Sequence, residues 1–152
     1  MYRRTPALIA AIALLAIAFG CGGDDGGDET VSRAEYVQRA NAICAKAEKQ
    51  KNAAIEAEFA RLGEEVQRLG QEAELQMVRT VALPPISRMV EQLAALPNPD
   101  ADAAEAEAIV AAYEAAVEEV ADEPVSVLSD PTPFTPADGL AEDFGLEACA
   151  GT

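Results

Sequence analysis

Apolar residues recur every three or four positions along most of this 152-residue chain. That spacing places side chains on one face of an α-helix, whereas a half-buried strand would alternate with a period of two. Only the short run Val125–Leu128 alternates in that way. The pattern therefore predicts an all-α fold, and the abundant alanine and frequent glutamate agree with it because both residues favour helices.

Local signals divide the apolar pattern into segments. A first helix should start near Ser32, which opens a Ser-x-x-Glu capping box. Its apolar stripe runs at near-heptad spacing from Ile55 to Met77. Gly63 and Gly70 lie off this stripe, and each costs about 1 kcal/mol relative to alanine within a helix. We therefore expect the long first helix to bend or break at these two glycines.

Proline-rich stretches are expected to end helices. The Leu-Pro-Pro run at Leu83 should end the first segment, because a proline disfavours helical geometry in the residue before it. Further helices are expected over 85–96 and 102–121, and a short last helix from Thr135 to near Cys149. The residues expected to face inward are Ile86, Met89, Val90, Leu93, Leu96, Ile109, Val110, Tyr113, Ala116, Val117, Val120, Leu140, Phe144 and Leu146. We expect a small antiparallel hairpin or bundle of three to four helices, in which the second and third return along the long first helix.

The first twenty residues have the layout of a bacterial export signal. Two arginines precede an apolar run from Leu8 to Phe19, which is too short to cross a bilayer as a helix. The Ala-Phe-Gly-Cys sequence at 18–21 resembles the lipobox of bacterial lipoproteins. That resemblance implies cleavage before Cys21 and attachment of a lipid to its sulfur. The alternative is cleavage after Ala18, which would give a secreted protein.

The charge of the chain limits what it can bind. Removal of the signal at 1–20 would take away two of the eleven Lys and Arg residues, so the net charge of −16 would become −18. The Gly- and Asp-rich residues 21–31 are expected to form a flexible tether before a helical domain at 32–150. Such a negative charge argues against nucleic acid and against flat contact with anionic lipid. A lipid on Cys21 would instead hold the protein at the membrane.

Catalytic residues are scarce. The chain has no histidine, which removes His-based triads, His general bases and the usual zinc sites. The remaining carboxylate candidates are Glu56, Glu58, Glu64, Glu65, Glu118 and Glu119. Each lies on an amphipathic helix, so a solvated surface is the expected role, and we predict no enzyme, cofactor or metal site. Asn41, Tyr36, Tyr113 and Phe144 are expected to be structural residues rather than ligand contacts.

Two cysteines remain once Cys21 is assigned to a lipid. Outside the cytoplasm such an even pair favours a disulfide between Cys44 and Cys149, although two structural thiols or a redox-active pair are alternatives. A bridge would close a loop of about 105 residues and contribute roughly 4–5 kcal/mol in the chain-entropy model. It would tie the end of the chain to the beginning of the first helix.

Three short motifs resemble a family of small exported helical proteins of high-GC Gram-positive bacteria whose function is not characterised. They are the Asn-Ala-Ile-Cys run at Asn41–Cys44, the proline break at Leu83–Ile86 and the Gly-Leu-x-x-Cys run at Gly145–Cys149. The resemblance covers most of the expected domain. It implies a helical fold and pairing of the two cysteines, and it brings no catalytic residue.

These features predict a lipoprotein on the extracytoplasmic face of the cell membrane that acts as a non-catalytic binding or interaction module. Its partner would be an envelope protein or a small apolar ligand in the groove of the hairpin. The alternative is a structural spacer of the cell envelope. In that case the stripe from Ile55 to Met77 would pair with a second copy as a coiled coil and form a homodimer.

Overall fold

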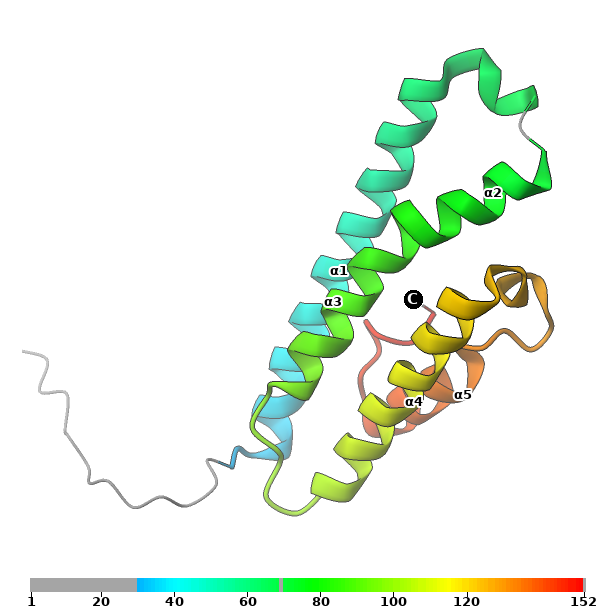
Figure 1. Ribbon diagram of the computed structural model, residues 1–152. Coiled ribbons are helices and arrows are strands. Elements are labelled where there is room, and N and C mark those ends of the chain that lie inside the picture. The colour runs from blue at the N-terminus through cyan, green and yellow to red at the C-terminus, as the bar shows by residue number, and fades with distance from the viewer. Residues whose placement is uncertain (1–29, 69, 152) are drawn as a thin grey trace, which may run out of the picture.

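The computed structural model describes residues 30–68 and 70–151, and its elements there are helices (Figure 1). A long hairpin forms the first part. One arm is α1 (Arg33–Leu62), whose 30 residues span about 45 Å. The other arm consists of α2 (Gln71–Met77), the π-helical turn η2 (Val78–Ala82) and α3 (Leu83–Ala94).

A second unit packs against the half of the hairpin that lies nearer the chain's beginning. It contains α4 (Ala103–Asp122), the short 3-10 helix η3 (Pro124–Leu128) and α5 (Thr135–Phe144). A disulfide joins Cys44 of α1 to Cys149, which follows α5. The predicted all-α hairpin with a long first helix and one disulfide is confirmed.

The fold begins where the sequence predicted, with one addition. Ser32 is the N-cap of α1, and its Oγ accepts a hydrogen bond from the Glu35 N–H at 3.2 Å. The preceding residue, Val31, was expected to end the tether but is buried. Its N–H donates to the carbonyl of Asn98 at 3.1 Å, and its carbonyl accepts from the Asp100 N–H at 3.0 Å. The folded part therefore includes Val31.

α1 ends at the first of the two glycines that were expected to weaken it. Gly63 caps the helix with a φ of 56°, a conformation that side chains with a Cβ disfavour. The chain then turns through η1 (Gly63–Arg68), and Gly70 precedes α2. The near-heptad stripe is thus divided between two arms that run in opposite directions.

The prediction that Leu83 ends the first segment is wrong. Leu83 has helical φ and ψ of −69° and −40°, and α3 continues directly from η2. In η2 the Leu83 N–H donates to the carbonyl of Val78, five residues back. We attribute the continuity to this wider turn, because it shifts the hydrogen-bond pattern just before Pro84 and Pro85, which have no N–H to donate.

The direction of the helices also differs from the expectation. The turn of the hairpin lies at Gly63, so α2 and α3 return along α1 and α4 runs back again, parallel to α1 (Figure 1). The core lies between α1, α3, α4 and α5. Its largest buried side chains include Tyr36, Met89, Leu93, Ile109, Tyr113 and Leu146. α2 contributes no buried residue, and Phe59 near the tip is 44% exposed.

Candidate ligand-binding site

An apolar cavity of about 420 Å³ lies where the second arm of the hairpin meets the end of α4, η3 and α5. Most of its lining is aliphatic or aromatic. The apolar lining residues are Val78, Ala82, Leu83, Ile86, Val120, Val127 and Phe134. Ligand sites typically occupy roughly 300–1,000 Å³ with such a lining and a few polar groups, so this cavity has the size and character of one.

Three polar residues complete the wall: Lys51 of α1, Thr132 of the loop before α5, and Asp138 of α5. Asp138 is held from the core side, because the Tyr113 Oη lies 3.0 Å from its Oδ1. The same hydroxyl lies 2.9 Å from the carbonyl of Cys149. A phenol has one proton, so Tyr113 donates to one of these acceptors at a time. Tyr113 is fully buried and thus has the core position expected for it.

The π-helical turn η2 forms one side of the cavity through Val78 and Ala82, its first and last residues. Such turns are frequent at functional sites. Between these residues, Arg79 donates from Nε to the carbonyl of Ala121 at 3.2 Å and from Nη2 to that of Asp122 at 2.9 Å. These carbonyls end α4 and would otherwise lack helical partners. Arg79 thereby fixes the cavity wall to α4.

The disulfide and a neighbouring asparagine hold the chain's last turn. Cys44 and Cys149 are both fully buried. One turn before Cys44, Asn41 donates from Nδ2 to the carbonyl of Gly145 at 3.2 Å and accepts at Oδ1 from the Ala148 N–H at 2.9 Å. Asn41 therefore has the structural role expected for it. The segment held in this way includes Gly151, which also lines the cavity.

The expected core aromatics lie at the other end of the domain. The rings of Tyr36 and Phe144 meet edge to face with centroids 5.8 Å apart, and burial raises the pKa of the Tyr36 hydroxyl. The Arg33 guanidinium lies 4.2 Å from the centroid of the Phe144 ring. Its Nη1 is also 3.3 Å from a carboxylate oxygen of Asp102. These contacts join α1, α4 and α5.

None of the six carboxylate candidates lines the apolar cavity. Five of them are exposed: Glu56, Glu64, Glu65, Glu118 and Glu119. Glu58 accepts two hydrogen bonds from Arg61, at 2.8 and 2.6 Å, and these lower the pKa of its carboxyl. A general acid would need the opposite shift. Within 30–68 and 70–151, no three Asp, Glu or Cys side chains cluster in a way that could hold a metal ion.

Cys21 and most of the expected tether lie outside the described residues, as does the expected signal at 1–20. Among the helices that are described, none is long and apolar enough to cross a membrane. The proposed lipid site therefore rests on the sequence around Cys21.

Some residues of the cavity wall were identified from the sequence, but as structural residues and not as part of a site. Leu83 was expected at a helix end, and Ile86 and Val120 on inward helix faces, but none of them as site residues. Val127 was noted only as part of the short alternating run, and Val78 and Phe134 were not singled out. Phe134 could have pointed to the cavity, because it is a large aromatic residue within the proline-rich stretch 124–136.

Comparison with known proteins found no matching family model, no matching curated protein and no matching solved structure.

Proposed function

We propose that this protein is a lipoprotein, anchored through Cys21 on the extracytoplasmic face of the cell membrane, that binds a small apolar ligand without chemical conversion. The observation that carries the binding role is the cavity of about 420 Å³ between the hairpin and the α4–α5 unit. Seven of its eleven lining residues are apolar and not glycine. A ligand that fills it would gain roughly 25 cal/mol for each Å² of apolar surface removed from water.

The anchoring role is supported by the sequence and by the disulfide. A lipobox-like cysteine follows an apolar run, and a Gly- and Asp-rich stretch separates it from the folded domain. The buried Cys44–Cys149 disulfide is typical of proteins that fold in an oxidising compartment.

Anchoring is tested by replacing the modified cysteine. Wild-type protein from the native host should partition into a detergent phase, and Cys21→Ala should move to the aqueous phase because no sulfur remains to carry the lipid. A Cys21→Ala protein that still partitions with detergent would refute the lipid anchor.

Binding is tested by filling the cavity. We expect native mass spectrometry of protein extracted from its own envelope to show a retained apolar molecule, and the purified protein to bind the apolar dye N-phenylnaphthylamine. Ala82→Phe should abolish both signals, because Ala82 lines the cavity. Ala115→Phe is the matched control, since Ala115 is exposed on α4 and does not line the cavity.

Thermal unfolding of both variants separates a filled cavity from a failed fold. A protein that carries no ligand and binds no dye would contradict the binding role, as would an Ala82→Phe protein that binds the dye like wild type.

A further inference from the structure

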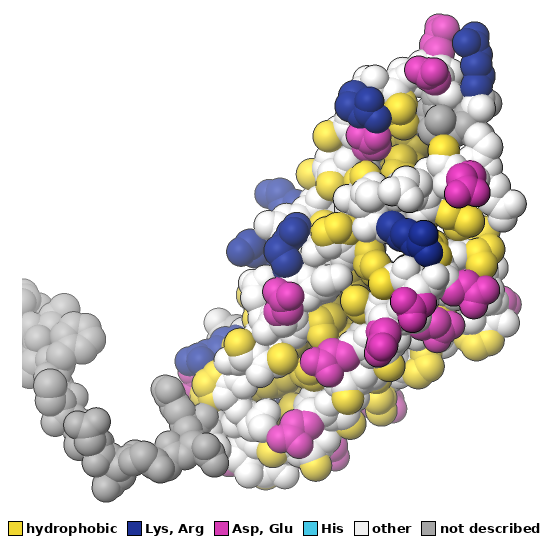
Figure 2. Space-filling model, viewed as in Figure 1, with side chains coloured by type: hydrophobic (Ala, Val, Ile, Leu, Met, Phe, Trp, Pro, Cys, Tyr) yellow, Lys and Arg dark blue, Asp and Glu magenta, His cyan; other side chains and the backbone are white. Residues whose placement is uncertain are grey.

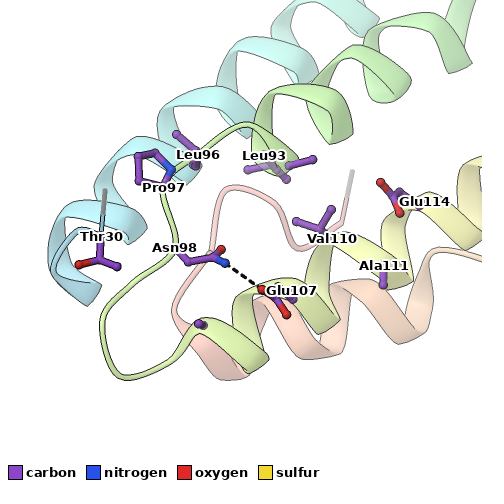
Figure 3. A pocket seen from close by; sticks show the side chains of 11 residues that line it. Thr30, Leu93, Leu96, Pro97, Asn98, Glu107, Val110, Ala111 and Glu114 are labelled. Carbon is purple, nitrogen blue, oxygen red and sulfur yellow. Dashed lines mark hydrogen bonds between the residues drawn. The ribbon is translucent and has the colours of Figure 1, made fainter. Parts of the chain in front are cut away.

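We propose that a second surface of the molecule binds a cationic amphipathic segment of a partner protein. This surface, called the acidic groove, has a volume of about 570 Å³ and lies between the end of α3, the following turn and the part of α4 from Ala103 to Glu114 (Figure 3). Its lining residues are Thr30, Leu93, Ala94, Leu96, Pro97, Asn98, Ala103, Glu107, Val110, Ala111 and Glu114. It is separate from the apolar cavity, with which it shares no residue.

The acidic groove has an apolar floor and an acidic side. In Figure 3, Leu93 of α3 lies opposite Val110 of α4. Glu107 and Glu114 lie on either side of Val110 along α4, about one and three turns after its first residue. Asn98 donates from Nδ2 to Glu107 Oε1 at 2.9 Å, which fixes that carboxylate at the groove. The lining residues given above include no Lys or Arg, so a partner must supply both an apolar side chain and the positive charge.

The distribution of charge along the chain strengthens this requirement. From Met89 to Thr152 the sequence has fifteen Asp and Glu residues and no Lys or Arg. All nine basic residues after the signal lie between Arg33 and Arg88, together with eight acidic ones. Figure 2 shows this separation, with the dark blue side chains over the hairpin and many magenta ones over α4. Arg33 pairs with Asp102 and Glu105 at the start of α4, but the acidic residues of this unit outnumber the basic ones near it. The resulting excess of negative charge attracts and orients a cationic partner.

The end of α3 adds to the negative potential. A helix carries a partial negative charge at its C-terminus, which a Lys or Arg in the last turn often balances. α3 has no basic residue in its last turn, and its final residue, Ala94, lines the groove.

The apolar floor disfavours a simple polyamine as the occupant, and the acidic side disfavours an anionic membrane. A peptide segment with Leu-like and Lys-like side chains on opposite faces matches both the apolar floor and the acidic side.

The position of the groove narrows the choice of partner if the chain is anchored through Cys21, as proposed above. Thr30 lines the groove and is nine residues beyond Cys21. Nine residues reach at most about 30 Å when fully extended. The groove would then stay close to the membrane, where the segment of a membrane protein that adjoins the bilayer can enter it.

The probe for the test is a fluorescent synthetic helical peptide with Leu on one face and Lys on the other, measured by anisotropy with the purified protein. Affinity should fall at least about tenfold between about 50 and 500 mM NaCl, as expected for charge-dependent binding. Glu107→Gln/Glu114→Gln should weaken binding by about threefold or more. Ala111→Phe, which blocks the groove without changing charge, should weaken it similarly.

The control Glu119→Gln/Glu142→Gln removes two charges from exposed positions on the same unit that do not line the groove. It should leave affinity within about twofold of wild type. An equal loss in this control, or normal binding by Ala111→Phe, would overturn the proposal in favour of unspecific charge attraction.

Two further outcomes are decisive. Salt-sensitive self-association that is lost in the groove variants would assign the groove to a second copy and overturn the proposal. Dye binding to the apolar cavity is measured on the same variants and should not change. If wild-type protein binds the dye but not the peptide, this inference alone is refuted. If wild-type protein binds the peptide but not the dye, the proposed ligand-binding function alone is refuted.

Discussion

Single residues far apart in the sequence hold the ends of this domain together. Cys44 and Cys149 are 105 positions apart and form a disulfide beneath the C-terminal turn. Their pairing could be predicted, because only two cysteines remained after Cys21. The detailed contacts could not, since the two hydrogen bonds that Asn41 makes to the C-terminal segment depend on how that segment docks.

Removing the disulfide should lower the free energy of unfolding substantially. We expect the Cys44→Ala/Cys149→Ala variant to lose roughly 4–5 kcal/mol, because the unfolded chain is no longer closed into a long loop. Urea denaturation monitored by circular dichroism measures the loss, with wild type in reductant as the comparison. An unfolding midpoint equal to that of oxidised wild type would contradict a stabilising role for the bridge.

Asn41→Ala should destabilise the fold without altering its helices. It leaves the Ala148 N–H and the Gly145 carbonyl without this partner, which costs about 1–3 kcal/mol for a part-buried group. The matched control is Asn52→Ala at an exposed position of α1, expected to change stability by less than about 0.5 kcal/mol. Equal stability of the two variants in urea would show that the Asn41 contacts contribute little.

Leu140 shows the limit of reading burial from apolar spacing. It was expected to face inward but is 42% exposed. The buried face of α5 is instead formed by Ala137, Ala141 and Phe144, at steps of four and three residues. α5 packs against α4, and two of its three buried residues are alanines, whose small side chains permit a close approach. Periodicity identifies a helix, but which of two neighbouring stripes is buried depends on how closely the partner helix approaches.

At the scale of elements, one glycine sets the length of α1. Gly63 adopts a positive φ of 56°, whereas Gly139 lies within α5, where a Cβ would meet no neighbouring atom within 4 Å. We therefore expect opposite effects from the same substitution. Gly63→Ala should destabilise the protein by about 1 kcal/mol or more, because alanine is strained at that φ. Gly139→Ala should stabilise it by up to about 1 kcal/mol, because alanine favours the helix.

Thermal unfolding of both alanine variants beside wild type measures these shifts. A stabilising Gly63→Ala would mean that α1 can continue past Leu62, and the division of the hairpin into two arms would then need revision.

The glycines and the proline pair were both expected to interrupt helices, and only the prediction from the glycines is confirmed. The weakness of Gly63 is a property of the residue itself, so the sequence could indicate it. The rule for a residue before proline describes local crowding, and it predicted a helix end at Leu83. Leu83 is helical in spite of that crowding, directly after a π-helical turn that packs against α1 and whose Arg79 donates to carbonyls of α4. Local sequence rules do not include such tertiary contacts.

At the scale of the whole molecule, the apolar cavity lay beyond sequence reasoning because helices and loops from most of the chain build it. Lys51, Ile86 and Gly151 meet at its wall from distant parts of the sequence. The separation of charge, in contrast, is readable directly, since no Lys or Arg follows Arg88. The fold then places most of this acidic stretch on α4 and α5, where Arg33 of α1 pairs with Asp102 and Glu105.

The hairpin also bears on whether the protein pairs with itself. A coiled coil needs an apolar seam sustained over about three to four heptads on one helix. Here α1 ends at Leu62, so the part of the stripe that begins at Ile55 continues for only about one heptad before the chain turns. The remaining residues of the stripe lie on the other arm. A net charge of −16 for the full chain, or −18 without the signal, further opposes association of like copies.

We therefore expect the purified domain from Cys21 onward to sediment as a monomer near physiological salt, about 0.15 M, where exposed charges act over about 8 Å. Sedimentation equilibrium at several protein concentrations measures this. Phe59→Ser is an informative variant, because Phe59 is the most exposed large apolar residue of α1. A concentration-dependent dimer that Phe59→Ser disrupts would support the coiled-coil spacer over the monomeric binding module, since the dimer would then use the tip of the hairpin. A monomer that Phe59→Ser leaves unchanged would contradict the coiled-coil spacer and agree with the proposed monomeric binding module.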